Sequence, residues 1–243
     1  IRLFRRSVLK QAKLRELVAF IGRSDGKRCL DIGGDSGIIS LLLRRQGGTW
    51  WSADLDETSV QSIRDLVGGC VTRMDGRSSP FKTAAFDLVV IVDFLEHITT
   101  DREFLLDMQR ILRPGGHLII HVPYARPRAF VNRIRKAIGL TDERHGHVRP
   151  GYTLEGLRHV LPADFVIEHA RTYSRACSEL IETTLSYAYD RIHRPDSRLP
   201  GAPSKGPIVT ADDAATHPRR FALLGLAYPF LWTVAQLDRL LLL

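Results

Sequence analysis

The segment Cys29–Gly37, followed by Trp50–Asp54, constrains the fold of this 243-residue chain more than any other feature. An apolar run ends at Asp31 and closely spaced glycines follow it, so the pattern predicts a strand, a tight turn and a helix from about Ile38. A helix start with unpaired N–H groups, and an acid roughly 20 residues beyond the turn, are typical of a site for a ribose-containing ligand. We therefore expect a βαβ unit whose second strand delivers Asp54 to that site.

Acidic residues around the turn narrow the choice of ligand. Turns that bind dinucleotides have the order Gly-x-Gly-x-x-Gly and hold a diphosphate at the helix N-terminus. Here Asp31 and Asp35 lie where the diphosphate would be, and their charges would repel it. They suit a nucleoside that carries positive charge, and S-adenosylmethionine, with a sulfonium and an ammonium group, is the obvious candidate.

Further motifs follow the turn in a specific order. They are Leu30-Asp-Ile-Gly-Gly-Asp-Ser-Gly37, Ser52-Ala-Asp-Leu-Asp56, Met74-Asp-Gly-Arg-Ser-Ser-Pro-Phe81 with Phe86-Asp-Leu-Val-Val90, and Asp93-Phe-Leu-Glu-His-Ile98 with Arg110-Ile-Leu-Arg-Pro-Gly-Gly116. Over roughly residues 27–170 the chain thereby resembles the class I S-adenosylmethionine-dependent methyltransferases, in the type 11 or ubiquinone-type small-molecule group. The resemblance implies an α/β, Rossmann-like doubly wound fold with a mostly parallel seven-stranded sheet, its seventh strand missing or truncated, and helices on both faces.

Asp35 departs from the family pattern. Members usually carry Asp-x-Gly-x-Gly-x-Gly, and Asp35 takes the place of the middle glycine. Asp is among the few non-glycine residues that tolerate a positive φ, so we expect cofactor binding to survive. The alternative is a degenerate site that no longer binds the cofactor.

Apolar runs predict the positions of the strands, and apolar residues at helical spacing predict those of the helices. The run Leu88–Val92 is continuously apolar, as a strand buried on both faces requires. No convincing seventh strand follows the sixth, and residues 207–210 are a weaker candidate for it. The expected strands span about 28–32, 49–53, 70–74, 86–92 and 116–122, and the expected helices 3–21, 38–45, 58–67 and 102–112. The resemblance implies a sixth strand at about 165–173.

The carboxyl ends of parallel strands meet at one edge, so the acids that follow them should line one crevice. By resemblance, Asp54 would hold the ribose, Asp75 and Gly76 the adenine edge, and the glycine turn with the end of strand four the methionine part. Asp75 is also a candidate turn cap. The cofactor site implied in this way comprises Asp31, Gly33, Gly34, Asp35, Gly37, Asp54, Leu55, Asp75, Gly76, Asp93 and Phe94.

Histidines supply the candidates on the acceptor side. His97 follows strand four and is the first candidate for a general base, or else a histidine that only packs and hydrogen-bonds. His145, His147 and Tyr152 lie in the segment after strand five, where relatives place substrate-contacting loops. Because no acid or cysteine pattern accompanies the two histidines, we expect no metal. Thr153, which precedes the segment Leu154–Leu157, is predicted to be a helix N-cap.

The ends of the chain extend the domain. We expect an amphipathic helix over 1–24, a methyltransferase domain over 25–193 with a substrate insert at about 124–153, a flexible linker over 194–220 and an apolar membrane-surface or docking helix over 221–243. The insert carries a basic stretch, Arg126–Lys136, which suits an anionic membrane, a phosphorylated substrate or an ordinary surface helix. Three scattered cysteines indicate no disulfide framework and favour a cytoplasmic protein.

Taken together, these features predict methyl transfer from S-adenosylmethionine to a small molecule, with lipid-linked and sugar-linked molecules among the candidate acceptors. They predict a cytoplasmic protein, for which a peripheral position on the inner face of the membrane stays open. A formal charge of +8 keeps RNA methylation as an alternative, although no aromatic stacking platform supports nucleic acid as a partner. A non-catalytic cofactor-binding scaffold is the second alternative.

Overall fold

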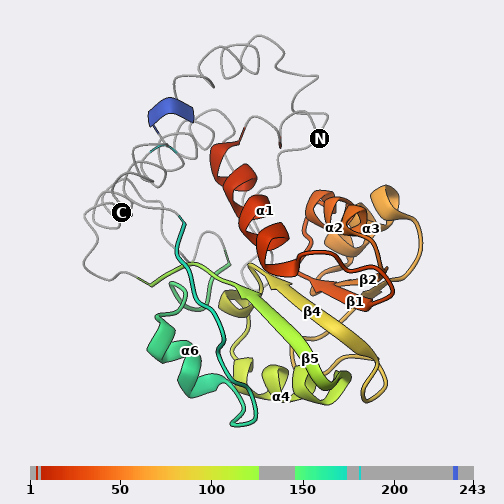
Figure 1. Cartoon of the computed structure of the whole chain (residues 1–243), viewed down its shortest axis with the longest axis vertical. Helices are drawn as coiled ribbons and strands as arrows, with labels where there is room; N and C mark the ends of the chain where they lie inside the picture. Colours follow the sequence, from red (N-terminus) through yellow and green to blue (C-terminus); the bar gives the residue numbers. More distant parts are fainter. Residues whose placement is uncertain (1–3, 5–6, 126–145, 174–180, 182–231, 235–243) are drawn as a thin grey trace.

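The computed structural model describes residues 4, 7–125, 146–173, 181 and 232–234, and Figure 1 shows the arrangement of the elements. The basic stretch 126–136, His145, the linker 194–220, the weaker strand candidate 207–210 and most of 221–243 lie outside the described residues. The elements in chain order are α1 (Val8–Ile21), β1 (Arg28–Ile32), α2 (Ile38–Leu43), η2 (Arg44–Gln46), β2 (Thr49–Asp54), α3 (Glu57–Val67), β3 (Val71–Arg73), β4 (Phe86–Val92), η3 (Leu95–His97), α4 (Asp101–Ile111), β5 (Leu112–His121) and α6 (Leu154–Val160).

Within the described residues, the sheet has five parallel strands in the order β3-β2-β1-β4-β5. From β1 the chain moves outward to β3 and then returns to the other side of β1 with β4. The order therefore reverses between β1 and β4, and in open α/β sheets ligands bind at this switch point, outside the carboxyl ends of the strands. The doubly wound α/β fold is confirmed.

Apolar cores cover both faces of the sheet. On one face Leu17 and Ile21 of α1 pack with Leu43 of α2 against strand residues such as Val90. On the other face the core is formed by α4, with Phe104 fully buried, and by the alternate strand side chains. Figure 1 shows α1 and α4 on opposite sides of β4 and β5. β4 can be apolar throughout because each of its faces meets one of these cores.

Several boundaries follow local capping. Asp56 accepts a 2.8 Å hydrogen bond from the Ser59 N–H, so α3 starts at Glu57. Thr153 accepts from the Gly156 N–H at 3.0 Å, which confirms the predicted N-cap. Among the described helices, none combines the length and apolar character that crossing a membrane requires.

The predicted sixth strand over residues 165–173 is wrong. This segment is described but forms no strand, and β5 is the last strand of the sheet in the described part of the chain. The resemblance implied a strand here, but a strand needs a hydrogen-bonded neighbour, and the segment is attached by side chains instead. His121 bonds the hydroxyl of Tyr173, and Arg171 pairs with Glu16 of α1.

Candidate active site

The glycine turn after β1 is packed against the end of β4. Gly33 has φ +91, and a Cβ atom there would lie 2.1 Å from the carbonyl oxygen of Val92. Gly37 has φ +76, and its Cβ would lie 2.8 Å from the Cα of Ile63 in α3. Only glycine fits such close approaches at positive φ. The turn is therefore held at the switch point between β1 and β4.

Asp35 occupies the left-handed region, with φ +51, at the place of the missing glycine. The prediction that Asp would accept a positive φ there is confirmed. Its backbone N–H donates a 3.0 Å hydrogen bond to Oδ2 of Asp54. The substitution consequently keeps the turn conformation and couples the turn to the acid at the end of β2.

Asp54 is buried beneath the turn and oriented by backbone donors. Its Oδ1 accepts a 2.8 Å hydrogen bond from the N–H of Leu55, and its Oδ2 accepts from Asp35. A carboxylate can accept about four hydrogen bonds, so two backbone donors are compatible with further donors such as ribose hydroxyls. Carboxylates at the turn also disfavour a diphosphate and favour a cation. These carboxylate acceptors thus fit a cationic nucleoside that donates hydrogen bonds from its ribose hydroxyls.

Asp31 lies inside the sheet rather than on the crevice surface. Its two oxygens accept from the hydroxyl of Ser52 at 2.8 Å, and Arg44 lies 3.8 Å away. Burial raises the pKa of Asp31 to about 6, against the opposing effect of Arg44. These contacts give Asp31 a positioning role under the turn, and its direct contact with a cofactor stays a prediction.

Asp93, at the end of β4, is also held in the left-handed region, with φ +44. Its carboxylate pairs with Lys13 of α1 and with Nδ1 of His121 at 2.8 Å. Burial favours the neutral acid, yet Lys13 and His121 outweigh it and hold the pKa of Asp93 well below its usual range. The ring of Phe94 stacks on Phe104, with centroids 4.9 Å apart. The Lys13–Asp93 pair joins helix α1 to the crevice, and this contact was not predicted from the sequence.

Asp75 caps the turn that follows β3. Its Oδ1 accepts from the N–H groups of Arg77 at 2.9 Å and Ser78 at 3.0 Å, and these bonds, Ser78 first, lower its pKa. Gly76 has φ +80, and its carbonyl accepts from Thr100 at 2.9 Å. Of the two predicted roles for Asp75, the structure contains the turn cap, and an adenine contact stays a prediction.

Two of the candidate histidines on the acceptor side, His97 and His147, come together. His97 and His147 make an edge-to-face contact with ring centroids 4.8 Å apart, and Nδ1 of His97 lies 3.1 Å from the carbonyl oxygen of Gly146. Fully buried Glu96 joins them. Sequence reasoning missed Glu96, although an acid inside the apolar stretch Leu95–Ile98 was a signal.

Tyr152 is buried rather than presented to the crevice. Its hydroxyl donates a 2.7 Å hydrogen bond to Oδ2 of Asp101 and accepts from Arg149 at 2.9 Å. Burial, together with Asp101, raises the pKa of Tyr152, so the hydroxyl stays protonated. The residue anchors the loop that carries His147, and a contact with substrate stays a prediction.

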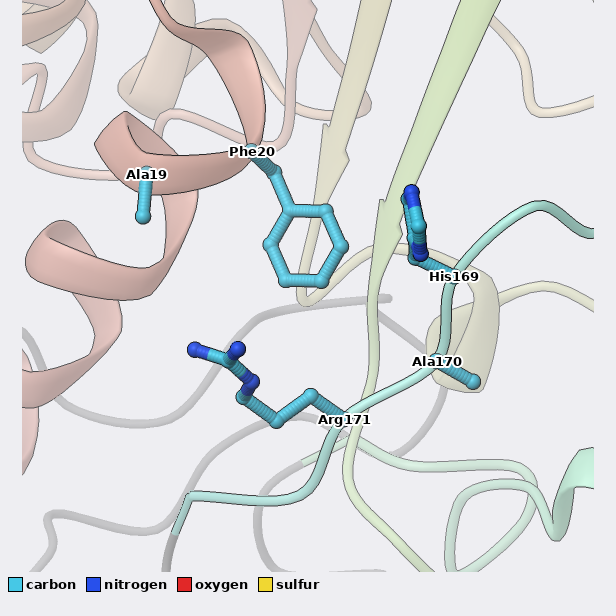
Figure 2. Close-up of a pocket in the computed structure, with 5 residues that line it drawn as sticks. All are labelled: Ala19, Phe20, His169, Ala170 and Arg171. Carbon is cyan, nitrogen blue, oxygen red and sulfur yellow. The ribbon is translucent and has the colours of Figure 1, made fainter.

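A separate cleft of about 430 Å³ lies between α1 and the segment 169–171. Figure 2 shows the Phe20 ring facing this segment, and the guanidinium of Arg171 lies 6.0 Å from the ring centroid. The cleft is lined by neither the glycine turn nor the acids that follow the strands. We therefore place the candidate site at the strand ends and not in this cleft.

Comparison with known proteins gives the family and the fold of the chain. Residues 4–164 match the family described as "Methyltransferase domain". An S-adenosylmethionine-dependent methyltransferase from Mesorhizobium loti has a similar fold, with a TM-score of 0.55 and 20% identity over 74% of this chain and 92% of that one. The fold and the family match define a class I S-adenosylmethionine-dependent methyltransferase domain, and the cofactor of this class is S-adenosylmethionine. The chain belongs to the methyltransferase-domain family.

Two curated relatives match a smaller part of the chain. The chain is 27% identical over 129 residues to demethylmenaquinone methyltransferase of Tropheryma whipplei (strain Twist), covering 51% of this chain and 54% of the relative. It is 31% identical over 111 residues to the ubiquinone/menaquinone biosynthesis C-methyltransferase UbiE of Cupriavidus taiwanensis, covering 42% and 46%. The chain thus spans about half the length of these relatives.

Proposed function

We propose that this chain transfers the methyl group of S-adenosylmethionine to an apolar or lipid-linked small molecule. The observation that carries the proposal is the hydrogen bond from the Asp35 N–H to Asp54, because it sets the predicted ribose-binding acid against the glycine turn. When bound, S-adenosylmethionine supplies an electrophilic methyl group. The cofactor would be held by the turn, by Asp54 and by the ends of β3 and β4, as the resemblance implies.

Two observations support an amphipathic acceptor. The names of both curated relatives refer to quinones, which are small molecules. The sequence of 221–243 is strongly apolar, and Trp232 within it has 44% of its surface exposed. An apolar segment of this kind supports a peripheral position on the inner face of a membrane, where such an acceptor would be found.

His97 is our candidate for proton acceptance if the acceptor is a hydroxyl. A carbonyl oxygen can only accept, so the contact with Gly146 places a hydrogen on Nδ1 of His97 and makes Nε2 the basic nitrogen. That atom would take the hydroxyl proton as the acceptor oxygen attacks. The main contribution of the fold would be alignment of the reactants and exclusion of water.

The proposal is tested by incubating the protein with methyl-labelled S-adenosylmethionine and a cell extract divided into an organic-soluble and an aqueous fraction. We expect label to enter the organic-soluble fraction with the wild type and not with Asp54→Ala. Label confined to small molecules of the aqueous fraction would contradict the apolar acceptor. Label in RNA, or no transfer by a protein that binds the cofactor, would contradict the proposed function as a whole.

A further inference from the structure

A carboxylate and two imidazoles meet beside the end of β4. Glu96 and His97 belong to η3, and His147 comes from the loop before α6, 50 residues further along the chain. We propose that Glu96, His97 and His147 bind a divalent transition-metal ion on the acceptor side of the crevice. This proposal differs from the sequence-based expectation of no metal, which rested on the absence of an acid or cysteine pattern around His145 and His147.

The spacing of the three groups is near that of a metal site. One ligand atom from each residue lies within 4.8 Å of the others. Ligand atoms of a tetrahedral zinc ion, at about 2.0–2.2 Å from the metal, lie about 3.3 Å from one another. Binding an ion at this site would therefore require the most widely spaced of these atoms to approach one another by about 1.5 Å.

The orientation of His97 is that of a metal ligand. Its Nδ1 donates to the carbonyl oxygen of Gly146 at 3.1 Å, so its Nε2 is the nitrogen that presents a lone pair. Metal-binding histidines commonly donate their second N–H to a backbone carbonyl, which fixes the tautomer and the ring. The same contact comes from the residue next to His147, so one loop both orients His97 and brings the third ligand.

That loop is fixed on η3 at several points. The N–H of Val148 donates a 2.8 Å hydrogen bond to the carbonyl oxygen of Glu96. Arg149 donates to the carbonyl oxygen of Ile98 at 3.0 Å and pairs with Asp101, which also accepts from the Tyr152 hydroxyl. A ligand set held in this way loses little conformational entropy when an ion binds.

The chemistry of the ligands selects the kind of ion. Imidazole suits zinc, iron, copper and nickel, whereas calcium and magnesium prefer oxygen ligands. Glu96 is fully buried, and a buried carboxylate is stabilised when a cation lies beside it. A set of two histidines and one glutamate is known for zinc and, with aspartate or glutamate, for iron(II). We therefore assign the site to a divalent transition ion such as zinc.

A structural ion pair between Glu96 and a protonated imidazole would produce the same clustering, so the test must measure the metal itself. The full chain, without a histidine tag and treated with a chelator, is titrated calorimetrically with Zn²⁺, and its absorption is recorded with Co²⁺. We expect one Zn²⁺ to bind per chain and a visible Co²⁺ spectrum typical of nitrogen and oxygen ligation. Zn²⁺ binding should also raise the melting temperature.

Matched variants locate the ion. We expect His147→Gln and Glu96→Gln each to weaken Zn²⁺ binding at least about tenfold and to change the Co²⁺ spectrum. His159→Gln, which alters an exposed imidazole of α6, should bind like the wild type. The proposal is overturned if binding is substoichiometric, or if both cluster variants bind Zn²⁺ as the wild type does. The two variants guard against misfolding of either one, which circular dichroism would reveal.

Zinc binding is measured without cofactor or acceptor, so its result is independent of the proposed methyl transfer. The role of His97 as a general base and its role as a metal ligand both use Nε2. A metal ion on Nε2 would occupy the position of the transferred proton, and His97 would then act as a base only in the metal-free protein.

Discussion

The backbone N–H of Asp35 donates a 3.0 Å hydrogen bond to Oδ2 of Asp54. This contact joins the turn after β1 to the acid at the end of β2, the two parts that a nucleoside would touch. Because the donor is a backbone group, the contact depends on the positive φ of residue 35 and not on its side chain. A chain that lacks the usual glycine can therefore keep the geometry of the turn.

The turn should tolerate glycine and reject β-branched residues at position 35. For Asp35→Gly we expect a change in unfolding free energy within about 0.5 kcal/mol, because relief of left-handed strain and the greater freedom of the unfolded chain are of similar size. Asp35→Val should lose about 2 kcal/mol, because a β-branched residue is strained at φ +51. Urea denaturation measures both. A valine variant as stable as the wild type would show that this conformation is not required.

A comparison of alanine substitutions at Gly33 and Gly68 should separate the stability cost of a steric clash from the cost of backbone strain. Gly33 and Gly68 both have positive φ, at +91 and +83, but a Cβ at Gly68 would meet nothing within 4 Å. We expect Gly68→Ala to cost about 1–2 kcal/mol from strain alone. Gly33→Ala should cost at least about 2 kcal/mol more, since its methyl group would collide with the Val92 carbonyl. Equal midpoints in urea would mean that the turn does not pack on β4.

Stability should depend on pH through Asp31. Its folded-state pKa of about 6 lies above the ordinary value of 3.8 for an aspartate, so the folded protein binds the proton more tightly than the unfolded chain. Stability is therefore expected to fall as pH rises from about 4 to 6, by up to about 3 kcal/mol. Denaturation at a series of pH values should show a flatter profile for Asp31→Asn. The exposed control Asp65→Asn should keep the wild-type slope, and an unchanged Asp31→Asn profile would refute the assignment.

Removal of the Tyr152 hydroxyl should destabilise the protein. Tyr152→Phe deprives the Asp101 carboxylate of a 2.7 Å donor inside the protein, which we expect to cost about 1–3 kcal/mol. Tyr124 is 49% exposed, so Tyr124→Phe should have little effect on the melting temperature. A melting temperature for Tyr152→Phe equal to that of the wild type would argue against the anchoring role.

Local signals in the sequence predicted the elements well where one interaction dominates. β4 was predicted with its observed bounds, because a strand with a core on each face leaves an uninterrupted apolar run. Thr153 was predicted as an N-cap, because a side-chain oxygen three residues before a free N–H acts within one turn. The left-handed conformation of Asp35 followed from the few residues that accept it.

Contacts between distant segments could not be predicted in this way. The Lys13–Asp93 pair and the meeting of Glu96 with His147 depend on how helices and loops pack on the sheet, which no short-range pattern records. The sixth strand failed for the related reason that the pairing of a segment with the edge of a sheet is a long-range contact, which the segment's own residues do not determine. Of the candidate site, the residues of the turn and strand ends were found from the sequence, whereas their side-chain partners required the structure.

Calorimetric titration with S-adenosylmethionine is the most direct test of the central claim, that the turn and Asp54 form the cofactor site. We expect micromolar binding by the wild type and by Asp65→Ala, whose altered side chain is exposed on α3. Binding by Asp54→Ala should be weaker by about a hundredfold, the effect of losing two hydrogen bonds to a charged group. Equal affinity of Asp54→Ala and the wild type, with both proteins folded, would contradict the claim.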